Sequence, residues 1–269
     1  MSNENNNLSL YGWSDNLFRQ KQISQFKDMS HGRIIVTHKT CYEVVAEDGV
    51  YLCELTGNMI YGRMPDEYPC TGDWVIFQPF DANKGIIVDT LPRERALYRK
   101  KNGTVADRQA IASYVDKAFI VQSLDDNFNV RRAERFIAQI MEENIKPVLV
   151  LNKADLGCDR QNIDEAIKHI ARQFPVFITS ICQPQTILRL RESITVVFVG
   201  SSGVGKSSLV NTLCGKSVLN TSDISLSTGK GRHTSTRREM VLVDGSGVLI
   251  DTPGVREFGL AIDNPDSLA

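Results

Sequence analysis

The segment Thr195-Val-Val-Phe-Val-Gly-Ser-Ser-Gly-Val-Gly-Lys-Ser207 indicates the fold class most directly. A run of β-branched and aromatic residues leads into G-x-x-x-x-G-K-[ST], and an apolar helical pattern follows over 208–214, which is the order strand, phosphate-binding loop, helix. The glycines let backbone N–H groups close around a β-phosphate at the positive end of that helix. Lys206 supplies a charge for the β- and γ-phosphates, and the Ser207 hydroxyl is placed to ligate Mg²⁺. The predicted nucleotide contacts of this loop are Gly200, Ser201, Ser202, Gly203, Val204, Gly205, Lys206, Ser207 and Ser208.

A base-reading motif lies upstream, in Val148-Leu-Val-Leu-Asn-Lys-Ala-Asp155. The Asp155 carboxylate can accept hydrogen bonds from guanine N1–H and N2–H₂, whereas adenine offers no matching donor pair. The Asn-Lys pair before it would brace the neighbouring loops and the base. The dipeptide at 179–180 fits either a small-residue turn behind the guanine or an ordinary turn at a strand end. The residues predicted to bind the base are Asn152, Lys153, Ala154, Asp155, Thr179 and Ser180.

Two segments after the loop complete the nucleotide signature. In Gly247-Val-Leu-Ile-Asp-Thr-Pro-Gly254, Asp251 ends a buried strand and suits an outer-sphere Mg²⁺ role, while the Gly254 N–H suits a γ-phosphate sensor. Residues 217–238 are rich in Ser, Thr, Gly and Lys, as expected of a loop ordered by the γ-phosphate, although a disordered linker has the same composition. The candidate Mg²⁺ ligands are Ser207, Thr234, Ser235 and Asp251.

Residues 103–269 are predicted to form an α/β domain with a six-stranded, mostly parallel sheet, because short apolar runs alternate with helical stretches. The runs are 118–121, 148–151, 176–178, 196–199, 241–243 and 248–250. Residues 129–143 show helical periodicity. The apolar face predicted for that helix contains Val130, Ala133, Ile137, Ile140 and Met141.

Residues 31–92 are predicted to form a small β-barrel. The Asp48-Gly49 turn between two apolar runs is a strong hairpin signal. The expected strands are 33–37, 42–46, 50–55, 73–77 and 85–89. Five short strands with glycine-marked turns favour an OB-fold, with another small β-sandwich as the alternative. Residues 1–30 form an N-terminal arm in this prediction, with one short helix around 16–26.

Residues 93–102 are predicted to be a basic linker that includes Tyr98. Such a charge run forms either a solvated face or, beside an OB-fold, a contact with RNA backbone. The candidate RNA-binding residues are Arg93, Arg95, Arg99, Lys100 and Lys101.

Bulk properties exclude several classes of protein. The net charge is −1, so any nucleic-acid surface is local and the chain as a whole is not a polycation. The six cysteines form no Cys-x-x-Cys pair, which argues against a disulfide framework or a metal site built from them. The polar N-terminus and the short apolar runs predict neither a signal peptide nor a membrane span, so we expect a cytoplasmic protein.

The order of the motifs is permuted: N-K-x-D, Thr-Ser, phosphate loop, Thr-rich switch, D-T-P-G. Ordinary GTPases begin with the phosphate loop and end with N-K-x-D. This order behind a small barrel, with Gly231-Arg-His-Thr and Asp251-Thr-Pro-Gly-Val-Arg-Glu257, closely resembles the bacterial ribosome small subunit-dependent GTPase A family (RsgA/YjeQ). The resemblance covers residues 8–269.

The resemblance implies binding of GTP and GDP with Mg²⁺, an OB-fold in contact with 16S ribosomal RNA, and hydrolysis stimulated by the small (30S) subunit late in its maturation. It also implies no membrane partner, and we expect a monomer. The family has a C-terminal zinc-binding domain with Cys and His ligands. This sequence ends at Ala269 without such a cluster, so zinc is not expected here.

The residue after D-T-P-G is Val255, where many GTPases have the glutamine that positions water. The family shares this hydrophobic residue, and the resemblance points to His233 in the switch segment as the catalytic candidate. A solvent-exposed histidine without a role is the alternative.

Two other functions compete with a GTPase. A phosphate-loop ATPase or kinase would not need Asn152, Lys153 and Asp155, and nucleotide competition would decide between them. A GTP-regulated RNA-binding protein with little turnover and no ribosome role is the second alternative. The intact Lys206, Ser207 and Asp251 argue against it.

Overall fold

The computed structural model of the 269-residue chain describes residues 7–61, 64, 66–100, 108–125, 128–156, 167–180, 194–201, 203–215, 238–243 and 247–251. They divide into two compact units. The first, called here the barrel unit, is built mainly from Trp13–Tyr114, and the second, the sheet unit, mainly from the described residues from Val115 onward. A 3₁₀ helix, η1 (Leu8–Tyr11), precedes the barrel.

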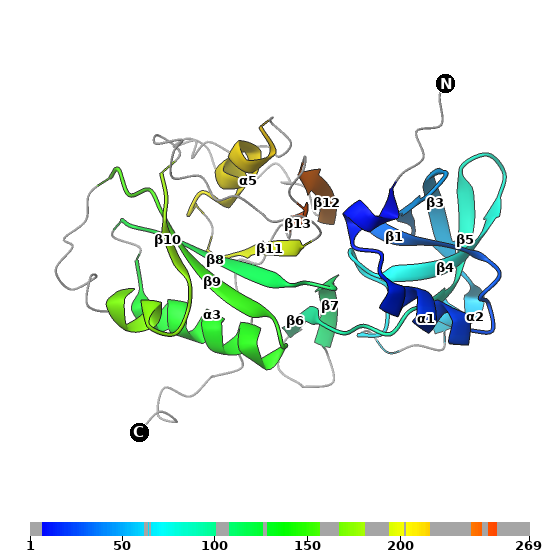
Figure 1. Ribbon diagram of the computed structural model, residues 1–269, viewed down its shortest axis with the longest axis horizontal. Helices are drawn as coiled ribbons and strands as arrows, with labels where there is room; N and C mark the ends of the chain where they lie inside the picture. The colour runs from blue at the N-terminus through cyan, green and yellow to red at the C-terminus, as the bar shows by residue number, and fades with distance from the viewer. Residues whose placement is uncertain are drawn as a thin grey trace, which may run out of the picture. The chain divides into compact units, whose positions relative to one another are not determined.

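The barrel unit contains the five predicted strands (Figure 1). They are β1 (Ser30–Thr37), β2 (Tyr42–Ala46), β3 (Gly49–Leu55), β4 (Trp74–Phe80) and β5 (Lys84–Thr90). β1–β2, β2–β3, β4–β5 and β1–β4 pair antiparallel, and β3–β5 pair parallel. The cycle β1-β2-β3-β5-β4-β1 closes the sheet on itself. The prediction of an OB-fold barrel is confirmed.

β1 closes the barrel because it can bend and pair on both sides. Gly32 stands where a side chain has no room, since a Cβ there would lie 2.3 Å from the Val45 carbonyl oxygen. The β1–β2 register then shifts between Ile34 and Val36, which marks a bulge and increases the local twist. The side chains that fill the barrel include Ile34, Tyr42, Val44, Ala46, Cys53, Met59, Val75, Phe77 and Ile87.

Two helices accompany the barrel. α1 (Asp15–Ile23) begins where the Ser14 side chain accepts a hydrogen bond from the Leu17 N–H at 3.4 Å. The predicted N-terminal helix is therefore present. α2 (Gly57–Tyr61) follows β3 and buries Met59 in the barrel core.

The expected basic linker contains a strand. β6 (Ala96–Lys100) pairs antiparallel with β7 (Arg108–Ser113). This ribbon is fixed to the loop before β4, where the Ser113 N–H donates to the Thr71 carbonyl at 3.1 Å. Gly72 has a φ of +103°, and a Cβ there would lie 2.4 Å from the Ser113 carbonyl oxygen. Within β6 only Ala96 and Leu97 are aliphatic, and basic residues end the strand. This composition is typical of a linker, so the sequence did not predict a strand.

The sheet unit contains six described strands in the order β10-β9-β8-β11-β13-β12. They are β8 (Lys117–Ser123), β9 (Lys146–Asn152), β10 (Val176–Ile178), β11 (Thr195–Val199), β12 (Arg238–Val243) and β13 (Gly247–Asp251). All neighbours pair parallel except β12 and β13, which pair antiparallel. The predicted α/β class is confirmed, and each predicted apolar run falls within a strand. β10 departs from the expected burial, since Phe177 and Ile178 are 44% and 53% exposed at the edge of the sheet.

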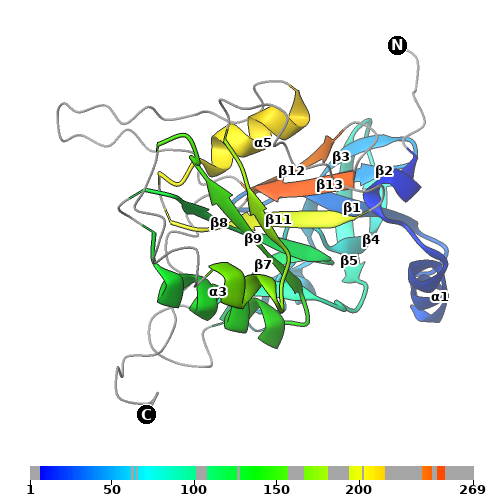
Figure 2. The ribbon, with the colours of Figure 1, turned by 60° about the vertical axis from the view of Figure 1, so that its left-hand side comes forward.

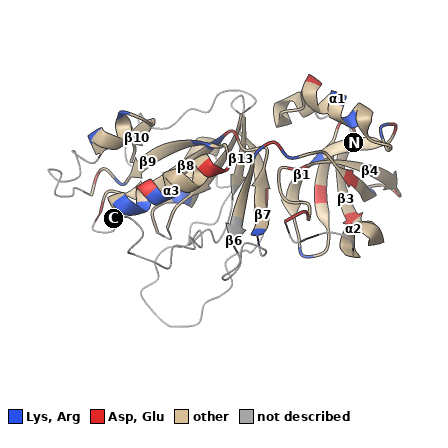
Figure 3. Cartoon of the chain, turned by 90° about the horizontal axis from the view of Figure 1, so that it is seen from below, with Lys and Arg blue, Asp and Glu red and all other residues tan. Residues whose placement is uncertain are grey.

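Two helices cover opposite faces of this sheet (Figure 2). α5 (Lys206–Cys214) packs Leu209 and Val210 against Phe119 and Phe198. α3 (Val130–Glu142) covers the other face, and the charged residues coloured along it in Figure 3 are exposed or half-buried. Its buried residues are Ala133, Phe136, Ile137 and Ile140.

The predicted apolar face of α3 is wrong at one position. Met141 is 50% exposed, and Phe136 is buried in its place. Phe136 lies four residues before Ile140, whereas Met141 is turned by about 100° from Ile140 at 3.6 residues per turn. No helix among the described residues is long and apolar enough to cross a membrane.

The described cysteines are free thiols, and they lie at scattered positions in the fold. Burial raises the pKa of the Cys53 thiol to about 12, so this side chain acts as a small apolar core residue. The cysteines described are Cys41, Cys53, Cys70 and Cys214, while Cys158 and Cys182 lie outside the described residues.

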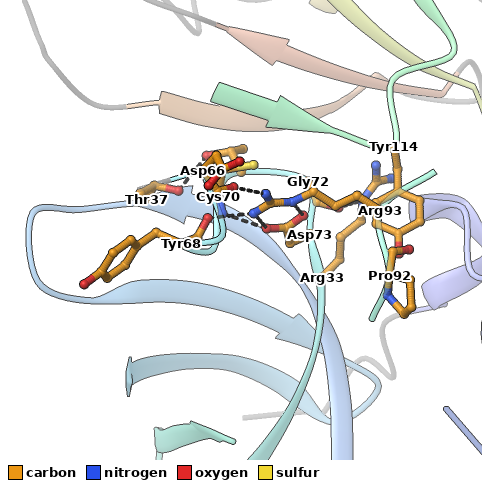
Figure 4. Close-up of polar contacts among 11 residues, drawn as sticks. Arg33, Thr37, Asp66, Tyr68, Cys70, Gly72, Asp73, Pro92, Arg93 and Tyr114 are labelled. Atoms are coloured by element: carbon orange, nitrogen blue, oxygen red, sulfur yellow. Dashed lines mark hydrogen bonds and ion pairs between the residues drawn. The ribbon is translucent and has the colours of Figure 1, made fainter. Parts of the chain in front are cut away.

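A buried ion pair fixes the segment that leaves the barrel (Figure 4). The Arg93 guanidinium donates to Asp73 through Nε at 2.8 Å and Nη2 at 2.7 Å, and to the carbonyls of Asp66 at 2.5 Å and Tyr68 at 2.6 Å. Asp73 also accepts from the Cys70 N–H at 2.8 Å. Burial alone would lower the pKa of Arg93, but the hydrogen bonds and charge of Asp73 outweigh it and raise that pKa. The expected contact of Arg93 with RNA is therefore not supported, because its donors are already used inside the fold.

Replacing Asp73 by Ala should lower the free energy of unfolding of the barrel unit by about 3–5 kcal/mol, because the Arg93 charge is left buried without its partner. Both tryptophans of the chain, Trp13 and Trp74, belong to this unit, so urea unfolding followed by their fluorescence measures it. The control is Lys84→Ala, which removes an ion pair whose side chains are 58% and 66% exposed and should cost only ~0–1 kcal/mol. Equal losses in the two variants would contradict the assignment.

Candidate functional site

The phosphate loop connects β11 to α5 as the motif predicts. Gly205 caps the N-terminus of α5 with a left-handed φ of +91°, and Lys206 begins the helix. The Lys206 ammonium turns back across the loop and donates to the carbonyls of Gly200 at 2.8 Å and Ser201 at 2.6 Å. Its charge therefore lies at the loop that the motif assigns to the phosphates. Ser207 follows in the first turn of α5 and is half-buried.

Two loop glycines are required by close approaches. A Cβ on Gly205 would lie 2.3 Å from the Asn152 Nδ2, and a Cβ on Gly200 would lie 2.3 Å from the Val121 carbonyl oxygen. Gly203 differs, because its φ is +78° but a Cβ there would meet nothing within 4 Å. The loop thus packs directly against the end of β8 and against the base-reading motif at the end of β9.

Asn152 joins the base-reading motif to the phosphate loop. Its side chain is buried, and its Nδ2 donates to the Val204 carbonyl at 3.0 Å. Its Oδ1 accepts from the Thr179 hydroxyl at 3.3 Å. One amide therefore links three segments that are far apart in the sequence.

The predicted dipeptide at 179–180 lies against the base-reading motif. The Thr179 carbonyl accepts from the Ala154 N–H at 3.2 Å. The Ser180 hydroxyl donates to Asp155 Oδ1, and Asp155 remains exposed. These contacts favour the interpretation of a turn that backs the base over that of an ordinary strand end.

Lys153 is held by a residue that the sequence analysis missed. Its backbone has a left-handed φ of +61°, and its Nζ lies 3.2 Å from Asp125 Oδ2. Asp125 Oδ1 accepts from the Ser123 hydroxyl at 2.7 Å. The available signal was a polar stretch directly after a buried strand, at the same edge of the parallel sheet as the end of β9.

The structure describes only some of the other residues that the sequence predicts for the site. Asp251 ends β13, the parallel neighbour of β11, so its backbone lies at the sheet edge that carries the phosphate loop. The Arg95 Nη1 lies 3.6 Å from the Glu94 Oε2, and Arg99 and Lys100 belong to β6. Within the described ranges no cluster of three His, Cys, Asp or Glu side chains is placed to hold a metal ion. Predictions that fall outside the described residues are Ser202, His233, Thr234, Ser235, Gly254 and Lys101.

Comparison with known proteins agrees with this arrangement. A family model described as RsgA GTPase matches residues 90–261. The chain belongs to the RsgA GTPase family. The small ribosomal subunit biogenesis GTPase RsgA 1 of Bacteroides thetaiotaomicron is 95% identical over 272 residues, which cover 100% of this chain and 77% of that protein. The small ribosomal subunit biogenesis GTPase RsgA of Leptospira interrogans is 34% identical, covering 97% of this chain and 73% of the relative.

Solved structures show the same fold. YjeQ from Thermotoga maritima superposes with a TM-score of 0.61 at 22% identity, covering 85% of this chain and 76% of that one. YloQ, described as a circularly permuted GTPase, superposes with a TM-score of 0.57 at 24% identity, covering 86% and 74%. The prediction of a barrel followed by a permuted GTPase fold is confirmed.

Replacing Gly205 by Ala should weaken GDP binding about ten-fold more than replacing Gly203 by Ala. Both changes strain a left-handed backbone, but only Gly205→Ala drives a methyl group into Asn152 and breaks its buried hydrogen bond to Val204. Calorimetric titration of the two variants with GDP measures the difference. Equal losses of affinity would show that the close approach of Asn152 does not matter for binding.

Proposed function

We propose that this GTPase binds the small ribosomal subunit and hydrolyses GTP in response to it, late in the maturation of that subunit. The observation that carries the proposal is the 95% identity, over the whole chain, to a protein named as a small ribosomal subunit biogenesis GTPase. The described site supports the GTPase half independently, since Asn152 holds the base-reading motif against the phosphate loop. We place this activity in the cytoplasm and propose a monomer.

In the proposed site, the residues of the base-reading motif select guanine. The exposed Asp155 carboxylate accepts from N1–H and N2–H₂, and its contact with the Ser180 hydroxyl holds it in place. Lys206 and the N–H groups at the start of α5 would hold the β- and γ-phosphates, at the positive end of the helix. The proposal thus assigns selection of the base to one part of the site and binding of the phosphates to another.

The proposed Mg²⁺ site uses the Ser207 hydroxyl, one of the hydroxyls of Thr234 or Ser235, and Asp251 through water. Ser207 suits this role because it lies in the first turn of α5, directly after Lys206. When bound, Mg²⁺ would neutralise charge on the β- and γ-phosphates.

We propose residues 31–92 as the domain that contacts 16S ribosomal RNA and residues 103–269 as the GTPase domain. Arg95, Arg99, Lys100 and Lys101 follow the last barrel strand closely in the sequence, and their positive charges suit contacts with RNA phosphates. Arg93 is left out of this set because its guanidinium is bound to Asp73. The backbone of Arg99 and Lys100 belongs to β6. A backbone that is already ordered in a strand loses less conformational entropy on binding than a loose linker would.

The proposal is tested by co-sedimentation with isolated small and large subunits, in a non-hydrolysable GTP analogue and in GDP. We expect binding to the small subunit, stronger with the analogue, and GTP turnover that is slow alone and rises strongly with small subunits. A Lys206→Ala variant should lose turnover and serves as the control for contaminating GTPases. No preference for the small subunit in either nucleotide state would overturn the ribosomal role and leave the GTPase assignment intact.

His233 is proposed to orient the attacking water, since Val255 cannot replace the glutamine used by other GTPases. His233→Ala should lower subunit-stimulated turnover about 10²-fold or more, which is the size expected when a group that assists proton transfer in the transition state is lost. Binding of GDP should stay unchanged. The matched control is His169→Ala, which removes an exposed histidine of the sheet unit. Unchanged stimulated turnover in His233→Ala would remove the catalytic assignment.

A further inference from the structure

Asp125 lies at the base-reading end of the sheet without a role in the function proposed so far. It follows β8 and contacts two neighbours through its two oxygens: the Ser123 hydroxyl at 2.7 Å and the Lys153 ammonium at 3.2 Å. The side chains of Lys153 and Asp125 are 29% and 30% exposed. The ion pair is therefore partly shielded from solvent, and one of its two partners belongs to the base-reading motif.

The position of Asp125 is fixed relative to the base-reading motif. The Leu124 N–H donates to the Asn152 carbonyl at 2.8 Å, which joins the residue before Asp125 to the residue before Lys153. Ser123 and Asn152 are also register partners in the β8–β9 pair. A carboxylate fixed in this way can orient a flexible ammonium group, which a carboxylate on a free loop cannot do.

Lys153 needs such a partner. A lysine side chain has four rotatable bonds, and ordering it when a ligand binds costs conformational entropy. A lysine whose ammonium is already bound to a fixed carboxylate has lost part of that freedom before the ligand arrives. Its methylene stem is then available as an ordered apolar surface for the flat face of a purine ring.

We propose that Asp125 is a positioning residue for guanine-nucleotide binding: its carboxylate holds the Lys153 ammonium so that the lysine stem is ordered against the base. This inference rests on the base-binding role proposed for Lys153. Asp125 acts through Lys153 and touches neither the base nor the phosphates. The stem contacts a ring face, so its contribution does not depend on the exocyclic amine that distinguishes guanine from hypoxanthine.

The test measures GDP and IDP affinities by calorimetric titration for the wild type, Asp125→Asn, Lys153→Met and the double variant. Asp125→Asn should weaken both nucleotides about three-fold, the size expected when a partly exposed ion pair is lost. The ratio of GDP to IDP affinity should not change. In the Lys153→Met background, Asp125→Asn should have no further effect, because the two residues act as one unit.

Two controls separate this role from others. Asp81→Asn removes the same charge at the exposed pair with Lys84 in the barrel unit and should leave affinity unchanged. Asp155→Asn should change the GDP to IDP ratio, because it acts on the exocyclic amine, and should shift preference from GTP towards XTP. In 1 M NaCl the difference between the wild type and Asp125→Asn should shrink, since salt screens the pair.

The outcomes are distinguishable. Two results overturn the positioning role. The first is a nucleotide affinity of Asp125→Asn equal to that of the wild type. The second is a loss of affinity that persists in the Lys153→Met background, because Asp125 would then act on the ligand directly. A changed GDP to IDP ratio overturns it as well, since the variant would be disturbing Asp155. A wild-type protein that does not prefer GDP over ADP would instead sink the base-reading role from the proposed function.

Discussion

The nucleotide site depends on one buried amide. Asn152 donates to the carbonyl of Val204 and accepts from the hydroxyl of Thr179, so the phosphate loop, the base-reading strand and the turn at 179–180 meet at a single side chain. This arrangement demands glycine at position 205, since any Cβ there would occupy the space of the amide. A buried amide that lost one of these partners would keep an unsatisfied polar group, which is costly in a dry interior. The geometry of the loop and that of the base-reading motif are therefore coupled.

The charged side chains discussed above fall into two groups that differ in their burial. In the barrel, Asp73 and Arg93 are largely removed from water and compensate each other, together with two backbone carbonyls, so their role is structural. At the edge of the sheet unit, Lys153 and Asp125 keep about a third of their exposure, and the Lys206 ammonium donates to two backbone carbonyls of the phosphate loop. Groups of the second kind can exchange their partners for a ligand at little cost, whereas breaking the first pair would leave a charge stranded in the interior.

The sequence identified the parts of the molecule whose chemistry is local. The phosphate loop, the base-reading motif and each apolar strand were predicted because spacing along the chain alone determines them. The barrel fold was also predictable, because the short strand lengths and the Asp48-Gly49 turn limit the possible strand pairings. Individual pairings between distant segments were not predictable. Nothing near Arg93 in the sequence indicates Asp73, and the polar stretch after the β8 run indicates only a shared sheet edge with Lys153, not the contact of Asp125. Strand β6 was missed for the same reason, since its partner β7 supplies the order that its own composition does not.

The order of strands in the sheet unit has a consequence for how the chain is made. β8, β9 and β10 are neighbours in the sheet and come first in the sequence, whereas β11 and the phosphate loop come later and pair with β8 from its other side. Because synthesis and folding proceed from the N-terminus, the base-reading half can assemble as a small parallel sheet before β11 has emerged. During that interval β8 has an open, apolar edge, which is an aggregation hazard until β11 adds to it. GTP, which binds only the completed loop, can stabilise the sheet only after β11 has joined it.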